Sequence, residues 1–185
     1  METPQLPFTG AHERRATPEP GAPWEGSGFG VMRERLQRAL AGRRVLELGG
    51  GAGEWTQVYA VRAAAVSVVE ARQELLALAR AVPYPAGRVE FVRSDVYALP
   101  DLGRRHDALF SASLWSRVPP ERLDAFLRQA VGAVAPGALV AFLGERGARG
   151  TPAESELIAR ASRCGWGANV ELLPGYWLLT WWAAH

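Results

Sequence analysis

The chain has 185 residues, 48% of them hydrophobic and 22% charged, which is the balance of one globular domain with a core of its own. Its 21 basic residues are all arginines and lie scattered along the chain, which argues against a nucleic-acid partner and excludes any chemistry that needs a lysine. No apolar segment reaches the length of a membrane span, and the single Cys164 cannot form an internal disulfide, so we expect no membrane partner and a cytoplasmic location.

Residues 1–30 are rich in proline and glycine and poor in apolar residues, which predicts an irregular arm preceding a domain at residues 31–185. A segment of this composition offsets its ordering entropy only when a ligand adds buried surface. We therefore expect a flexible lid over the ligand site, with Trp24 as its anchor and the glycines of residues 26–30 as its hinge.

From residue 31 onward, short apolar runs alternate with segments of helical periodicity. Strands are predicted at residues 45–48, 64–70, 89–94, 107–113 and 138–143. Helices are predicted at residues 31–42, 54–61, 73–81, 119–133 and 153–163. This alternation indicates an α/β fold whose parallel sheet is covered on both faces. Two last strands, residues 168–172 and 176–183, are too close for a crossover helix and must pair as an antiparallel hairpin.

The stretch VLELGGGAGEW, residues 45–55, places four glycines among the six residues that follow a strand, directly before a helix. In an open α/β sheet this junction lies at the carboxyl edge, where ligands bind, and glycine lets a ligand approach the bare backbone. The dinucleotide pattern G-x-G-x-x-G fits poorly, because its last glycine would fall on Glu54.

The stretch contains E-x-G-x-G-x-G, formed by Glu47, Gly49, Gly51 and Gly53, and this resembles motif I of the class I S-adenosylmethionine-dependent methyltransferases. The resemblance extends from about residue 31 to the C-terminus. It implies a Rossmann-like three-layer sandwich with a mostly parallel, seven-stranded sheet that ends in an antiparallel hairpin. It also implies S-adenosylmethionine as the cofactor and S-adenosylhomocysteine as the product.

Three further strand ends match the family pattern. Glu70, with Ala71 beside it, corresponds to the acid that binds both ribose hydroxyls, and a carboxylate suits two O–H donors. Asp95 and Val96 correspond to the adenine-binding pair, and Ser111 to the strand that lines the methionine end. From the residues alone, Glu70 could also be a solvated acid and Asp95 a turn residue.

The acceptor side is less well defined by the sequence, and no catalytic residue is assigned. We expect Trp24, Trp115 and Glu145 to contact the acceptor, and Trp55 lies in a similar position, so a small, apolar or aromatic molecule is favoured. His12 and Glu145 are weak candidates for a general base. No metal is expected.

Other sequence features concern the core and the partner. His106 should lie at the edge away from the ligand, and Trp177, Trp181 and Trp182 should be buried in a core strand. The acceptor side has no inserted cap domain, so the arm or a partner subunit of a homodimer would have to close it.

Two alternatives to a small-molecule methyltransferase stay open from the sequence. One is a non-catalytic module that binds S-adenosylmethionine for regulation, and the other is a nicotinamide-dependent oxidoreductase.

Overall fold

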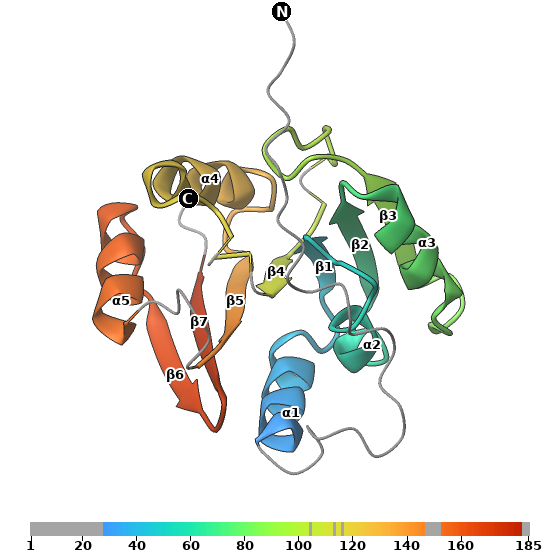
Figure 1. Cartoon of the computed structure of the whole chain (residues 1–185), viewed down its shortest axis with the longest axis horizontal. Helices are drawn as coiled ribbons and strands as arrows, with labels where there is room; N and C mark the ends of the chain where they lie inside the picture. The colour runs from blue at the N-terminus through green and yellow to red at the C-terminus, as the bar shows by residue number, and fades with distance from the viewer. Residues whose placement is uncertain (1–27, 104, 113, 116, 147–152, 183–185) are drawn as a thin grey trace, which may run out of the picture.

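The computed structural model describes residues 28–103, 105–112, 114–115, 117–146 and 153–182 (Figure 1). The helices are α1 (Phe29–Ala39), α2 (Thr56–Tyr59), α3 (Gln73–Ala81), α4 (Pro120–Gly132) and α5 (Glu154–Arg163). The strands are β1 (Arg44–Leu48), β2 (Ala65–Glu70), β3 (Val89–Arg93), β4 (Ala108–Ala112), β5 (Leu139–Glu145), β6 (Asn169–Leu173) and β7 (Tyr176–Trp182). The predicted arm falls mainly on residues outside these ranges.

The strands form one seven-stranded sheet in the order β3-β2-β1-β4-β5-β7-β6, which Figure 1 shows from right to left. The pairs among β1 to β5 are parallel, and β7 runs antiparallel to both β5 and β6. This confirms the predicted α/β fold and the C-terminal hairpin. Strand order reverses between β1 and β4, and at such a point open α/β sheets bind ligands.

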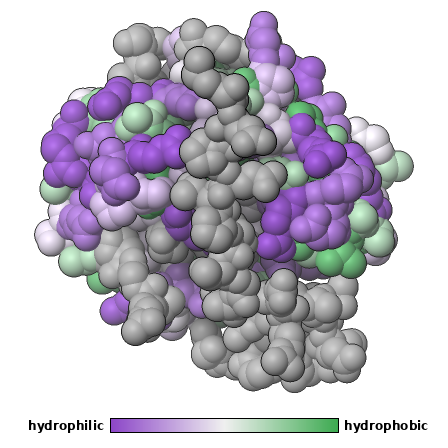
Figure 2. Space-filling view, turned by 45° about the horizontal axis from the view of Figure 1, so that its top comes forward, coloured by the Kyte–Doolittle hydropathy of each residue, from purple (hydrophilic) through white to green (hydrophobic). Residues whose placement is uncertain are grey.

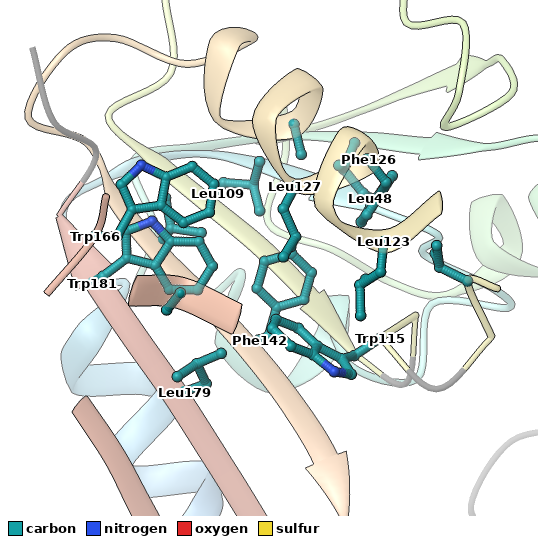
Figure 3. Close-up of a cluster of buried hydrophobic side chains, with 14 of the residues drawn as sticks. Leu48, Leu109, Trp115, Leu123, Phe126, Leu127, Phe142, Trp166, Leu179 and Trp181 are labelled. Carbon is teal, nitrogen blue, oxygen red and sulfur yellow. The ribbon is translucent and has the colours of Figure 1, made fainter. Parts of the chain in front are cut away.

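Each face of the sheet carries its own hydrophobic core because successive residues of a strand point to opposite faces. Val45 of β1 belongs to the core under α1 and α2, whereas Leu46 and Leu48 belong to the core under α4 and α5. The second core is rich in aromatic rings, and Figure 3 shows Trp166, Trp181, Phe142 and Trp115 in it. With both faces covered, the parallel strands read as continuous apolar runs.

Three local predictions need correction. The helix predicted at residues 54–61 is the four-residue α2, and Val61 beyond it is 55% exposed. Gly30, predicted as part of a hinge, lies in the first turn of α1. Trp182, opposite Leu139 at the end of β7, is 58% exposed, although Trp177 and Trp181 are buried as expected.

On the face seen in Figure 2, hydrophilic residues cover most of the described surface, and the hydrophobic residues form small, separated areas among them. Within the described part of the chain, no helix is long and apolar enough to cross a membrane.

Candidate functional site

The carboxylate of Glu70 joins the ends of β1 and β2 at the carboxyl edge of the sheet. Its Oε2 accepts a hydrogen bond of 3.0 Å from the backbone N–H of Gly51, and its Oε1 accepts one of 3.0 Å from the N–H of Arg72. Glu70 is only 9% exposed, so these bonds fix the orientation of a nearly buried carboxylate. Each oxygen keeps a further lone pair, which can accept an O–H donor from a ligand.

Two glycines of the loop meet different steric demands. Gly51 has a φ of 58°, and among the described residues a Cβ there would meet only Glu54 Oε2, at 3.5 Å, so its side-chain position leaves space that a ligand can fill. Gly53 has a φ of 88°, and a Cβ there would overlap the hydroxyl of Tyr84 and approach Ala79 of α3 to 3.4 Å. A side chain at Gly51 would therefore lie in free space above the loop, whereas Gly53 lets the loop pack against α3 and Tyr84.

The carboxyl of Glu47 lies beneath the loop, at 1% exposure. Its Oε2 accepts hydrogen bonds from the hydroxyls of Thr56, at 2.6 Å, and Tyr59, at 2.7 Å. Burial raises the pKa of Glu47 to about 7, although the two hydroxyl donors oppose the shift. In this structure Glu47 anchors α2 to β1 and does not reach the ligand side of the loop, unlike the direct cofactor contact that the sequence predicts.

Ser111 likewise serves the fold in this structure. Its hydroxyl donates a 2.8 Å hydrogen bond to the backbone oxygen of Leu48, and the side chain is fully buried. The bond ties the end of β4 to the end of β1, at the point where strand order reverses. Ser111 thus fixes the distance between the two strand ends that a ligand would bridge.

Asp95 lies exposed after β3, on the side of Glu70 away from β1. Its Oδ1 accepts a hydrogen bond of 2.9 Å from the N–H of Tyr97, which is the turn role that the sequence allows. The neighbouring Val96 packs against the core under α4, and Ala71 is exposed after β2. The strand ends thus present the carboxylates of Asp95 and Glu70 in the order in which a long ligand would meet them.

A family model described as a methyltransferase domain matches residues 45–137, which are 93 of the 185 residues. The chain belongs to this methyltransferase family. The matched range contains the glycine loop, Glu70, Asp95 and Ser111, so every residue predicted to bind the cofactor lies within it.

Solved structures agree with this assignment. A complex of DhpI with SAH is 28% identical, with 84% of this chain and 85% of that chain covered and a TM-score of 0.71. A complex of DhpI with SAM and HEP is 26% identical, with 83% of this chain and 86% of that chain covered and a TM-score of 0.67. The N-methyltransferase NodS from Bradyrhizobium japonicum, bound to S-adenosylhomocysteine, has a similar fold and is 14% identical. The match covers 84% of this chain and 87% of that chain, with a TM-score of 0.68.

No curated protein sequence matches the chain. The family and the ligands of the similar structures show that the chain is an S-adenosylmethionine-dependent methyltransferase. The oriented Glu70 carboxylate and the open space above Gly51 suit this cofactor, which carries two ribose hydroxyls. The nicotinamide alternative is thereby excluded, and the enzyme is favoured over a purely regulatory module.

The three residues of the methyltransferase that are predicted to contact the acceptor differ in location and exposure. Trp24 lies outside the described residues. Glu145 is exposed at the carboxyl end of β5. Trp115 follows β4 and is 3% exposed, and its ring packs edge-on against that of Phe142, with 5.5 Å between the ring centroids (Figure 3). The ring of Trp177 packs edge-on against Trp115 as well, with the centroids 6.3 Å apart. Trp115 therefore belongs to the core wall, because its ring is buried against these two aromatic side chains.

Sequence analysis missed an aromatic cluster at the same edge. The centroid of the Trp55 ring lies 6.0 Å from that of the Phe29 ring and 5.8 Å from that of the Tyr176 ring, and all three residues are half-buried. Phe29 begins α1, Trp55 follows the glycine loop, and Tyr176 begins β7 opposite Glu145. The sequence marks Trp55 as a candidate, but nothing in it indicates that residues so far apart in the chain meet.

The histidine predicted to lie away from the ligand does so. His106 precedes β4 at the amino edge of the sheet, is 2% exposed, and its Nε2 lies 2.7 Å from the hydroxyl of Ser67. Burial lowers the pKa of His106, which favours the neutral imidazole. Among the side chains that the structure describes, no group of histidine, cysteine and acidic residues could hold a metal ion.

Proposed function

We propose that the methyltransferase binds S-adenosylmethionine across the ends of β1 to β4 and methylates a small, apolar or aromatic acceptor held at the ends of β5 and β7. The three half-buried rings of Phe29, Trp55 and Tyr176 carry this proposal. They form an apolar wall where the glycine loop meets the C-terminal hairpin. A flat acceptor can stack on such a wall.

On the cofactor side, Glu70 would accept hydrogen bonds from both ribose hydroxyls, since each of its oxygens already points to the edge and keeps one lone pair. Asp95 would accept from the adenine amino group, with Ala71 and Val96 on either side of the ring. The loop at Gly49, Gly51 and Gly53 would support the cofactor from below. Glu47 and Ser111 would hold this loop and β4 in place from within the core.

The bound cofactor supplies a methyl group on a sulfonium, whose departure leaves a neutral thioether. The chain's own residues therefore act mainly by alignment and by excluding water, and positioning alone is worth on the order of 7–11 kcal/mol. Glu145, exposed beside Tyr176, would orient a proton-bearing group of the acceptor. Trp115 would support the site from the core wall, and Trp24 would complete it from the arm.

The test is an acceptor screen on the full chain with S-adenosylmethionine, in which S-adenosylhomocysteine is measured by mass spectrometry. The panel contains phenols, indoles, aromatic amines and aromatic carboxylates, together with HEP, the ligand found with DhpI. We expect ring-bearing acceptors to raise product formation above the acceptor-free background. A panel in which HEP reacts and every ring compound fails would contradict the acceptor class.

A matched pair of tryptophans tests the wall. Trp55→Leu should raise the acceptor KM about tenfold, since lost ring packing and burial exceed about 1.4 kcal/mol, while affinity for S-adenosylhomocysteine changes less than about twofold. Trp182→Leu, which changes an exposed tryptophan that ends β7 at the amino edge of the sheet, should change neither. Equal KM values in the wild type and Trp55→Leu would remove Trp55 from the acceptor site.

A further inference from the structure

The geometry points to a second ligand site, a groove between α1 and the strands β5, β7 and β6 that binds a small organic anion, meaning a phosphate or carboxylate on an apolar body. The groove has a volume of about 380 Å³, which lies within the range of small-molecule sites. Its walls are formed by Arg35, Arg38, Ala39, Arg43, Leu139, Glu171, Leu178, Thr180 and Trp182.

The groove is separate from the cofactor site. Arg43 precedes β1, Leu139 begins β5 and Trp182 ends β7, so this end of the groove lies at the amino edge of the sheet. Glu70 and Gly51 lie at the opposite, carboxyl edge. All the lining residues also fall outside residues 45–137, the range that matches the family model. The groove is therefore not part of the matched methyltransferase domain.

The guanidinium of Arg43 is held in a fixed orientation inside the groove. Its Nε donates a 2.9 Å hydrogen bond to the backbone oxygen of Ala39, and its Cζ lies 5.2 Å from the ring centroid of Trp182. Within the described part of the chain, its two terminal nitrogens have no hydrogen-bond partner. A planar guanidinium fixed in this way offers parallel N–H donors that match a phosphate or carboxylate.

The other charges in the groove favour an anion as well. Arg35 and Arg38 add to Arg43, whereas Glu171 is the one acidic residue in the lining and is paired with Arg35 at 3.0 Å. Arg38 is paired with Glu34 on the solvent side of α1 at 3.1 Å. The lining thus carries an excess of positive charge, which attracts anions and repels cations.

An apolar surface lies beside this charge. Trp182 is 58% exposed, and Leu139 and Leu178 form the apolar part of the lining. A large ring left in water next to a fixed guanidinium suits an apolar body that carries an anionic group. A second copy of the chain fits less well, because a two-fold contact centred on the groove would place its arginines against the same arginines.

The experiment is calorimetric titration of the full chain, saturated with S-adenosylhomocysteine so that the cofactor edge is occupied. The probes are phenyl phosphate, phenylacetate, inorganic phosphate and benzyl alcohol. We expect phenyl phosphate or phenylacetate to bind with a Kd of about 1 mM or below, more tightly than inorganic phosphate, and benzyl alcohol not to bind. The first two probes distinguish a phosphate site from a carboxylate site.

Variants locate the binding. Arg43→Gln and Trp182→Leu should each weaken the bound anion at least about tenfold, whereas Arg33→Gln, an exposed arginine of α1 outside the groove, should not. Arg43→Lys keeps the charge without the planar guanidinium, so it should also weaken binding. It provides the same test if Arg43→Gln fails to fold.

Three outcomes would overturn the proposal. The first is no binding of either organic anion up to about 10 mM. The second is an equal loss in Arg33→Gln, which would mean diffuse attraction to scattered arginines. The third is a dimer in sedimentation that Arg43→Gln dissociates, which would make a second copy the occupant.

Discussion

At the scale of single residues, two glutamates of the matched domain make different contacts because Glu70 lies two residues nearer the carboxyl edge of the sheet than the residue paired with Glu47. Glu47 is the fourth residue of the five in β1, and its side chain enters the core under α2. Glu70 is the last residue of β2, and its carboxylate turns to the backbone N–H of Gly51 and Arg72. The first acid stabilises the loop from within, and the second lies at the edge where we propose that the cofactor binds.

The burial of Glu47 makes the stability of the protein depend on pH. Its pKa is raised from 4.5 to about 7 in the folded chain, so the folded state binds the proton more tightly than the unfolded state. The resulting stabilisation is fully present below pH 4.5 and is lost as the pH rises through about 7. A shift of this size corresponds to about 3 kcal/mol.

Urea unfolding at pH 4.5 and pH 8 measures this effect in the wild type and in Glu47→Gln, whose neutral amide keeps an acceptor for Thr56 and Tyr59. We expect the variant to gain about 3 kcal/mol relative to the wild type between the two pH values. Glu74→Gln, a change of a 72% exposed acid, should gain nothing. Parallel pH profiles for the wild type and Glu47→Gln would show that the carboxyl is ionised throughout.

At the scale of elements, the strands and most helices could be predicted because their apolar residues follow a regular period. The short α2 could not, since the bonds from Thr56 and Tyr59 to Glu47 that hold it join elements nine or more residues apart. The burial of Trp115 could not be predicted from the sequence either. The direction in which a loop turns depends on the partners it meets, here Phe142 and Trp177.

The candidate site divides in the same way. The positions of Glu70, Asp95 and the glycines at strand ends follow from the motif and the strand pattern. The reason for Gly53 does not, because Tyr84, which would overlap a side chain there, lies more than thirty residues later in the chain. The wall of Phe29, Trp55 and Tyr176 depends on three separate elements and emerges only in the folded structure.

The glycine loop allows a prediction that separates backbone strain from ligand contact. Gly51→Ala and Gly87→Ala both place a side chain on a positive φ, 58° and 71°, and among the described residues neither Cβ would come closer than 3.5 Å to a neighbouring atom. Each should cost about 1 kcal/mol of unfolding free energy in urea. Gly87 precedes β3 at the amino edge, so only Gly51→Ala should weaken S-adenosylhomocysteine binding in calorimetry, by at least about tenfold. Equal affinities in the two variants would mean that the cofactor does not lie over Gly51.

At the scale of the whole molecule, the two edges of the sheet have different tasks. The carboxyl edge holds Glu70, Asp95 and the aromatic wall. The amino edge holds the buried His106 and the end of the groove that contains Arg43 and Trp182. α1 connects the two edges, because Phe29 at its start lies against Trp55, while Arg43 just after its end lies over Trp182. A change in how α1 packs would therefore alter the contacts at both edges of the sheet.

The start of α1 also bears on the predicted arm, most of which lies outside the described residues. Gly28 is the N-cap of α1, and a Cβ there would overlap Pro174 in the turn before β7, so the chain enters the described fold at the carboxyl edge. Residue 28, at which the described part of the chain begins, thus lies beside the aromatic wall. This is the position that the sequence-based prediction of a lid requires.

Deletion of residues 1–23, and separately Trp24→Ala, should lower turnover of the acceptor found in the screen by at least about tenfold. Both changes should leave S-adenosylhomocysteine affinity within about twofold, because Glu70 and the loop remain intact. The reason is that a lid excludes water and aligns the acceptor, whereas the cofactor is held by the strand ends. Hydrogen exchange of residues 5–30 provides the direct measurement. Protection there should rise on saturation with S-adenosylhomocysteine and acceptor, and unchanged exchange would assign the arm no part in closing the site.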